Sequence, residues 1–206
     1  ETFMRSPNKV EKLAYLYGLT YYTPKVKMCG ISKVETIPAI VEAKPDYMGL
    51  VFAPSKRQVT VDKAKTLVEA LHKLYAKTYG TNTVPMNAEV TQDTNGFGEE
   101  NTNSEAIKTV GVFVNETLDN LVTIAKEANL DAVQLHGDED EAFIQALKEK
   151  TDVEIWKAVQ IRSAADAEAW IDSSADMLLF DAYHKDERGG TGEVFDWSCL
   201  DEFERP

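Results

Sequence analysis

The chain has 206 residues, with 22 Lys and Arg against 35 Asp and Glu, and a formal net charge of −13 at pH 7. Its 43% of hydrophobic and 28% of charged residues are typical of an ordinary globular protein with a sizeable core. The negative charge argues against partners such as nucleic acid or a membrane surface, and no apolar run is long enough to span a bilayer.

Short apolar runs alternate with helix-periodic segments from Pro24 onward. The runs predict parallel strands that are covered on both faces. They lie at residues 26–31, 47–52, 109–114, 132–137, 155–161 and 177–182. The helices between them are marked by apolar stripes, with a capping box at 32–35 before the first and Asp138 as the expected cap of the fourth.

The strands recur about every 22 residues, apart from one long interruption. Strict alternation of strands and helices predicts an α/β protein, and the near-constant period favours a (β/α)8 TIM barrel. Only six of the eight units are visible, so we expect a barrel truncated at its C-terminal end. The interruption at about 78–106 is rich in Thr, Asn, Glu and Gly, and we expect a disordered surface insertion there.

Polar residues at the carboxyl ends of barrel strands point into the active site of this fold. Four such residues are candidates, and each of them could also have a purely structural role. They are Cys29, Arg57, His136 (with Gln134 two residues before it) and Asp181. A strand cysteine is often only packed, a loop arginine only solvated, and a histidine only hydrogen-bonded. Asp181 is the hardest to explain structurally, because it ends an apolar run.

The number and spacing of the cysteines and histidines limit the kinds of site that the chain can form. Cys29 and Cys199 do not make a disulfide framework, which suits a reducing compartment and a cytoplasmic location. His72, His136 and His184 are too scattered for a zinc site, so no metal is expected. A thiol and a carboxyl group at one barrel mouth form a metal-free acid–base pair, which suits an isomerase that moves a proton between neighbouring carbons.

Five motifs carry a family resemblance across residues 25–197. They are KMCGI (27–31), SKRQV (55–59), VGVFVN (110–115), VQLHGDE (133–139) and LLFD (178–181) followed by GGTGEVFDW (189–197). In this order and spacing they resemble phosphoribosylanthranilate isomerase. The resemblance implies a step of tryptophan biosynthesis, the Amadori rearrangement of N-(5-phosphoribosyl)anthranilate, a small phosphorylated substrate, with no cofactor.

The resemblance also implies roles for the four candidates. Cys29 matches the general base and Asp181 the general acid. Arg57 matches the arginine near the anthranilate carboxylate, and His136 the histidine of the site. The substrate phosphate is implied on loops after strands seven and eight, so we expect the piece with six strands to be inactive alone.

Residues 1–24 resemble the end of indole-3-glycerol-phosphate synthase, and residues 25–206 the isomerase. We therefore expect a multifunctional parent protein with that synthase fused upstream. Two alternatives stay open. One is the histidine-pathway ribosyl isomerase, against which Cys29 speaks because that enzyme has aspartate there. The other is a degenerate, non-catalytic barrel that serves as a scaffold.

Overall fold

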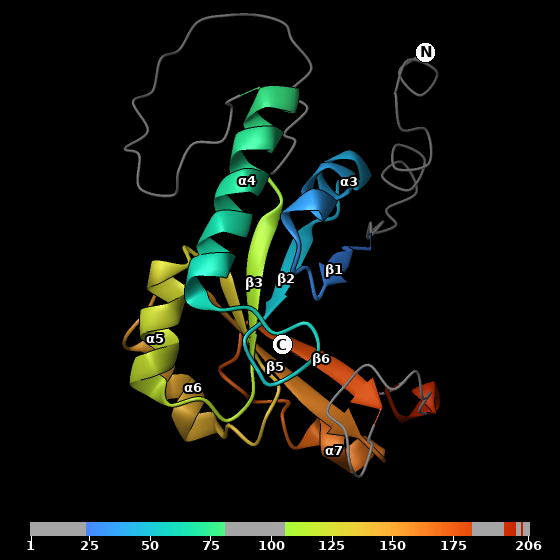
Figure 1. The fold of residues 1–206 in the computed structure, drawn as a ribbon. Helices are drawn as coiled ribbons and strands as arrows, with labels where there is room; N and C mark the ends of the chain where they lie inside the picture. Colours follow the sequence, from blue (N-terminus) through green and yellow to red (C-terminus); the bar gives the residue numbers. More distant parts are fainter. Residues whose placement is uncertain (1–23, 81–105, 183–195, 201–202, 204–206) are drawn as a thin grey trace, which may run out of the picture.

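The computed structural model describes residues 24–80, 106–182, 196–200 and 203 (Figure 1). Three regions singled out in the sequence lie mostly outside the described residues. They are the segment at 1–24, the insertion at 78–106 and the glycine-rich loop at 189–197. The insertion was predicted to begin too early, because Thr78 and Tyr79 still belong to a helix.

Six strands form one parallel sheet whose spatial order follows the chain, as predicted. They are β1 (Lys27–Cys29), β2 (Tyr47–Val51), β3 (Lys108–Phe113), β4 (Ala132–Leu135), β5 (Glu154–Ile161) and β6 (Met177–Ala182). All five pairings are parallel, as crossover connections through helices require. The strand positions confirm the alternating pattern of the sequence.

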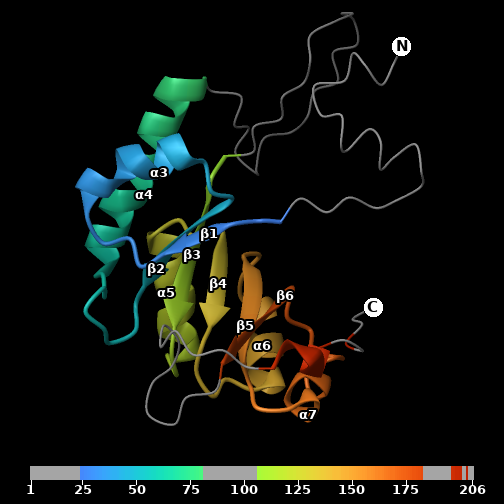
Figure 2. The ribbon, with the colours of Figure 1, turned by 90° about the vertical axis from the view of Figure 1, so that its right-hand side faces the viewer.

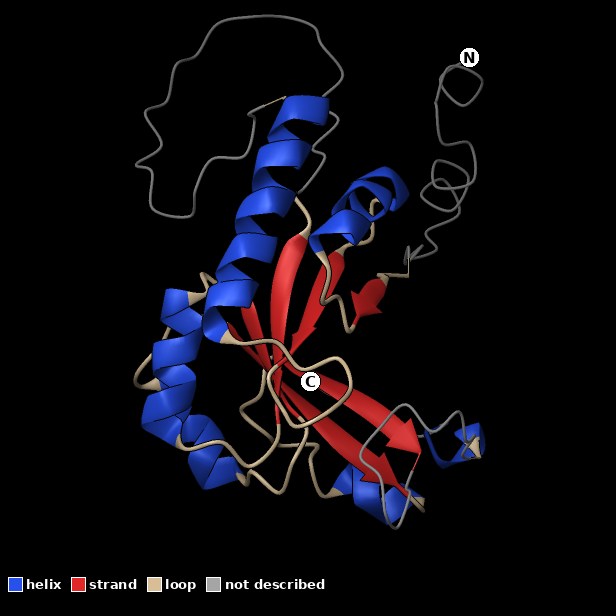
Figure 3. Ribbon diagram, in the orientation of Figure 1, coloured by secondary structure: helices blue, strands red, loops and turns tan. Residues whose placement is uncertain are grey.

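The helices from η1 to α7 lie between consecutive strands and cover one face of the sheet (Figure 3), and η2 follows β6. They are η1 (Val34–Thr36), α3 (Ile37–Ala43), α4 (Val61–Tyr79), α5 (Leu118–Glu127), α6 (Glu141–Lys148), α7 (Ala164–Glu168) and η2 (Trp197–Leu200). The apolar stripe of α4 is buried as its 3.6-residue period predicts, and Thr60 caps the helix by accepting a hydrogen bond from Lys63 N. The main core lies between these helices and the sheet.

The sheet curls (Figure 2), and side chains of strands that are distant in the sheet order meet across its concave face. Tyr47 of β2 and Trp156 of β5 are three strands apart, yet their ring centroids are 4.7 Å apart in an edge-to-face contact. Strands in a flat sheet are about 4.8 Å apart, so three steps would separate such residues by about 14 Å. The described strands therefore form a curled half-barrel with a small apolar cluster on its inner face.

Two local predictions about helix starts are wrong. The expected capping box at 32–35 does not form, since η1 begins after Lys33 and no side chain caps it. The helix α6 is capped by Asp140, which accepts a hydrogen bond from Phe143 N, and not by Asp138. Asp138 is hydrogen-bonded to the Asn115 side chain instead. This tertiary contact engages Asp138, and the helix is capped by the next suitable residue.

None of the helices in the described part of the chain is both long and apolar enough to cross a membrane.

Candidate active site

The four candidate residues all lie at the carboxyl ends of strands. Cys29 is the last residue of β1, Arg57 lies in the loop after β2, His136 directly follows β4, and Asp181 is the second-last residue of β6. The sequence predicted these positions because Cys29, His136 and Asp181 lie near the ends of apolar runs and Arg57 lies in the loop that follows one.

The strand register places Cys29, Gln134 and Asp181 on the same face of the sheet. Direct partners in adjacent strands share a face, and the row through Cys29 runs through Gly49, Val110, Ala132 and Glu154. Gln134 lies two residues beyond Ala132, and Asp181 pairs with Gln160, six residues beyond Glu154. Even separations keep a residue on one face, here the concave face.

His136 and Asp181 contact each other directly. The His136 Nε2 atom lies 3.2 Å from Asp181 Oδ2, and its Nδ1 atom lies 2.8 Å from Gln134 Nε2. The side chain of His136 is 14% exposed and that of Asp181 is 32% exposed. The carboxyl group is therefore held by a mostly buried imidazole while part of its surface stays open to a ligand.

Burial is the largest influence on His136 and lowers the pKa of its imidazole. The neighbouring carboxylate of Asp181 acts in the opposite direction, while the charges of Lys27 and Lys157 lower the pKa further. The net direction is downward, so the histidine is predominantly neutral at pH 7.

Cys29 and Arg57 lie together around two glycines. A Cβ atom on Gly49 would lie 2.7 Å from Cys29 Sγ, so only glycine leaves room for the thiol there. A Cβ atom on Gly30 would lie 2.6 Å from Arg57 Cδ, and Gly30 has a φ of +83° that favours glycine. The arginine side chain therefore lies over the turn that follows the cysteine, and Cys29 itself is exposed.

Lys27 connects the two groups of candidates. Its ammonium group donates a hydrogen bond to Gln134 Oε1 and lies 5.4 Å from the centroid of the Trp156 ring. Burial lowers the pKa of Lys27, and the thiolate form of Cys29 opposes that shift.

A buried ion pair that the sequence analysis missed lies beneath the turn of His136. Lys157 Nζ is 3.3 Å from Glu139 Oε2 and 2.8 Å from the carbonyl oxygen of Gly137, to which it donates a hydrogen bond. Glu139 also accepts hydrogen bonds from the backbone N–H groups of Asn115 and Gly137. The available signal was the lysine within the apolar run 155–161.

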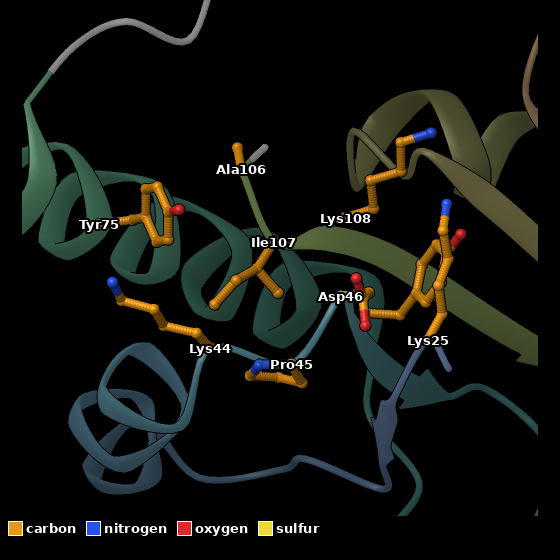
Figure 4. A pocket seen from close by; sticks show the side chains of 9 residues that line it. Lys25, Lys44, Pro45, Asp46, Tyr75, Ala106, Ile107 and Lys108 are labelled. Atoms are coloured by element: carbon orange, nitrogen blue, oxygen red, sulfur yellow. The ribbon is translucent and has the colours of Figure 1, made fainter. Parts of the chain in front are cut away.

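A pocket lies at the opposite end of the strands from the four candidates (Figure 4). It has a volume of about 240 Å³, and Lys25, Lys44, Asp46 and Lys108 are among its lining residues. The lysine charges are already engaged there, since Lys44 lies over the Tyr79 ring and Lys108 pairs with Glu154. In barrel enzymes the catalytic groups lie at the carboxyl ends of strands, so this pocket is not the candidate active site.

A metal centre has no support in the described ranges, where no group of three or more His, Cys, Asp or Glu side chains could hold an ion. What the site offers is a thiol, a carboxyl group, an imidazole and a guanidinium group. Such a set can move protons and bind an anionic substrate.

Comparison with known proteins gives a consistent result. A family model described as N-(5'-phosphoribosyl)anthranilate (PRA) isomerase matches residues 76–205. The N-(5'-phosphoribosyl)anthranilate isomerase of Thermoanaerobacter sp. (strain X514) is 38% identical over 180 residues, which are 87% of this chain and 71% of that protein.

Solved structures agree with the sequence relatives. The phosphoribosylanthranilate isomerase of Thermotoga maritima superimposes with a TM-score of 0.62 at 28% identity, over 86% of this chain and 70% of that one. A phosphoribosylanthranilate isomerase in complex with reduced 1-(o-carboxyphenylamino)-1-deoxyribulose 5-phosphate gives a TM-score of 0.56 at 26% identity, over 78% and 66%. The curled six-stranded sheet with its outer helices thus has the fold of these TIM-barrel-like enzymes, and the chain belongs to the phosphoribosylanthranilate isomerase family.

Proposed function

We propose that this chain catalyses the isomerase step of its family in tryptophan biosynthesis, with Cys29 as general base and Asp181 as general acid. The substrate would be N-(5-phosphoribosyl)anthranilate, and the product 1-(2-carboxyphenylamino)-1-deoxyribulose 5-phosphate. The observation that carries the proposal is the placement of a thiol and a carboxyl group on one concave face, at the carboxyl ends of β1 and β6.

The first step is opening of the ribose ring. Asp181, as the carboxylic acid, donates its proton to the ring oxygen while the bond from that oxygen to C1′ breaks. The lone pair of the anthranilate nitrogen forms a C=N bond and leaves an iminium ion. The partial exposure of Asp181 lets a substrate reach this carboxyl group, and the contact with His136 orients it.

The second step is proton removal from C2′ by the Cys29 thiolate. The electrons of the C2′–H bond move toward the iminium carbon and neutralise the nitrogen, which gives an enol. The enol then gains a proton at C1′ and loses one from its hydroxyl group, and the product is the ketone. No electron leaves the substrate, so the reaction needs no redox cofactor.

Arg57 is proposed to bind the anthranilate carboxylate. A guanidinium group can hold a carboxylate through two parallel hydrogen bonds, which fixes both position and orientation. Its place over Gly30 puts it next to the turn that follows Cys29. His136 is proposed to contact the substrate from the other side, beside Asp181.

The test is an isomerase assay that follows the loss of phosphoribosylanthranilate fluorescence. The unaltered chain is assayed first, which also tests the expectation that six strands alone are inactive, and its variants follow. Cys29→Ala and Asp181→Asn are each expected to lower kcat by about 10²-fold or more, since each removes a proton-transfer group. Cys199→Ala is the matched control, because Cys199 lies in η2, outside the strand ends that form the site, and it is expected to keep the full rate. A Cys29→Ala variant with wild-type kcat would overturn the assignment.

Two further expectations remain predictions. The fusion to an indole-3-glycerol-phosphate synthase concerns residues 1–24, nearly all outside the described ranges, and the relatives compared above are named as the isomerase alone. A cytoplasmic location likewise rests on the cysteine usage of the sequence.

A further inference from the structure

Four side chains form a continuous hydrogen-bonded chain across the concave face. The Lys27 ammonium group on β1 contacts Gln134 Oε1 on β4, and Gln134 Nε2 lies 2.8 Å from His136 Nδ1. His136 Nε2 in turn lies 3.2 Å from Asp181 Oδ2 on β6. Gln134 is 4% exposed, so water has little access to the centre of this chain.

The direction of each hydrogen bond follows from the groups at its ends. An ammonium group has only donors, so the atom of Gln134 that faces Lys27 must be the amide oxygen. The amide nitrogen therefore faces His136, and it can only donate. The Nδ1 atom of His136 must accept that hydrogen bond, so the ring proton of the neutral imidazole lies on Nε2 and is donated to Asp181.

This direction matters for a general acid. An imidazole with a free Nε2 lone pair beside a carboxylic acid would accept its proton and form an imidazolium–carboxylate pair. Asp181 would then hold no proton for the substrate. An imidazolium also carries a proton on Nδ1, which would face the N–H donor of Gln134, and Lys27 opposes the rotation of the amide that could relieve this conflict.

We propose that Gln134, oriented by Lys27, is a positioning residue that fixes His136 as the neutral Nε2–H tautomer, which donates a hydrogen bond to Asp181 and has no free Nε2 lone pair to take the acid proton from it. This inference rests on the proposed role of Asp181 as general acid. The charged groups that face His136 shift the pKa of its imidazole in opposite directions. Lys27 on β1 and Lys157 on β5 favour the neutral imidazole, while Asp181 on β6 favours the imidazolium.

The first measurement is the tautomer of His136 by ¹⁵N NMR of histidine-labelled protein, with its signals identified through a His136→Gln variant. The expected result in the unaltered chain is protonated Nε2 and unprotonated Nδ1, with a pKa below the ordinary value near 6.5. The opposite tautomer, or an imidazolium at pH 7, would overturn the proposal without any variant.

The second measurement uses Gln134→Glu. The new carboxylate would accept a proton from Nδ1, so the imidazolium becomes favourable and the pKa of His136 is expected to rise by about one unit or more. We expect kcat to fall by about tenfold or more while KM changes less than twofold, and the acidic limb of the pH–rate profile to move. Gln145→Glu, the same change at an exposed position of α6, is expected to alter none of these values.

Lys27→Met gives an independent route to the same conclusion if Gln134→Glu does not fold. It frees the amide to rotate, and a mixture of His136 tautomers is expected. A His136 tautomer and pKa that are unchanged in the variant would overturn the positioning role. A protein that has the expected His136 tautomer but does not convert phosphoribosylanthranilate would instead contradict the proposed function. The hydrogen-bonded side chains would then have no role in this catalysis.

Discussion

Lys157 and Glu139 form an ion pair whose side chains are 3% and 2% exposed. Both charges are paired by protein groups, since Glu139 accepts two backbone hydrogen bonds and Lys157 donates one to the Gly137 carbonyl oxygen. Burying such charges costs free energy, and removal of one partner leaves the other uncompensated. The pair joins β5 to the turn after β4, which is the turn that starts at His136.

The residue-scale prediction is that Lys157→Met lowers the free energy of unfolding by about 3 kcal/mol, within the range for breaking a buried ion pair. Urea unfolding followed by circular dichroism measures it. Lys150→Met is the matched control. Its partner Asp119 is 88% exposed, so the expected loss is below about 1 kcal/mol. Equal losses in the two variants would contradict the structural role of the buried pair.

At the scale of elements, α7 depends on a charged cap. Asp166 accepts hydrogen bonds from the Arg162 side chain at 2.7 Å and from Ser163 N at 3.0 Å, and a capping box joins it to Ser163. The Arg162 guanidinium is the largest cause that lowers the pKa of Asp166 from 3.8 to about 2. Folding therefore favours the carboxylate over the carboxylic acid.

The element-scale prediction is that Asp166→Asn loses stability at pH 6 but not at pH 2. A carboxyl group with a depressed pKa stabilises the fold above its unfolded value near 3.8, and this contribution disappears as the pH falls to about 2. Exposure of Arg162 to solvent reduces the expected difference to about 1 kcal/mol. Asp119→Asn is the control, and an Asp166→Asn difference that is constant from pH 6 to pH 2 would refute the argument.

The elements were predictable to different degrees. Apolar runs and helical stripes located all six strands and the main helices, because burial on both faces leaves a clear pattern in the sequence. Helix starts were less predictable, because Asp138 and Asp140 are equally good caps locally and only the contact with Asn115 decides between them. The short helix α7 has too few apolar residues to be recognised from periodicity.

At the scale of the whole molecule, the sequence located the candidate catalytic residues, with Gln134 beside His136, but not the contacts that join them. Strand-end position alone identified Cys29, His136 and Asp181. The chain from Lys27 through Gln134 to His136 depends on how far the sheet curls, and no local pattern encodes that distance. The ion pair of Lys157 could not be predicted from a local pattern either. The face of β5 on which Lys157 lies, the one covered by helices, follows from the register of β5 with β4 and β6.

Trp156 connects the curl of the sheet to the site. It is 1% exposed, it contacts the Tyr47 ring from three strands away, and its indole ring lies under the Lys27 ammonium group. Its Nε1–H group donates to Glu154 Oε2 at 3.2 Å. The residue therefore supports the inner apolar cluster and one end of the polar chain together.

The whole-molecule prediction is that Trp156→Ala lowers the free energy of unfolding by about 3–5 kcal/mol, as expected for a buried tryptophan. Trp156→Phe keeps an aromatic ring against Tyr47, so the expected loss is smaller, but a smaller ring without the indole attracts Lys27 less strongly. Urea unfolding measures stability, and ¹⁵N NMR of His136 measures the polar chain. Trp197→Phe, at a position 65% exposed, is the control. If the curl of the sheet and the site are coupled as the contacts indicate, Trp156→Phe shifts the ¹⁵N signals of His136 and Trp197→Phe does not. A Trp156→Phe variant that is destabilised but has unchanged His136 signals would contradict this coupling. It would show that the packing of the sheet does not affect the hydrogen-bonded side chains on its concave face.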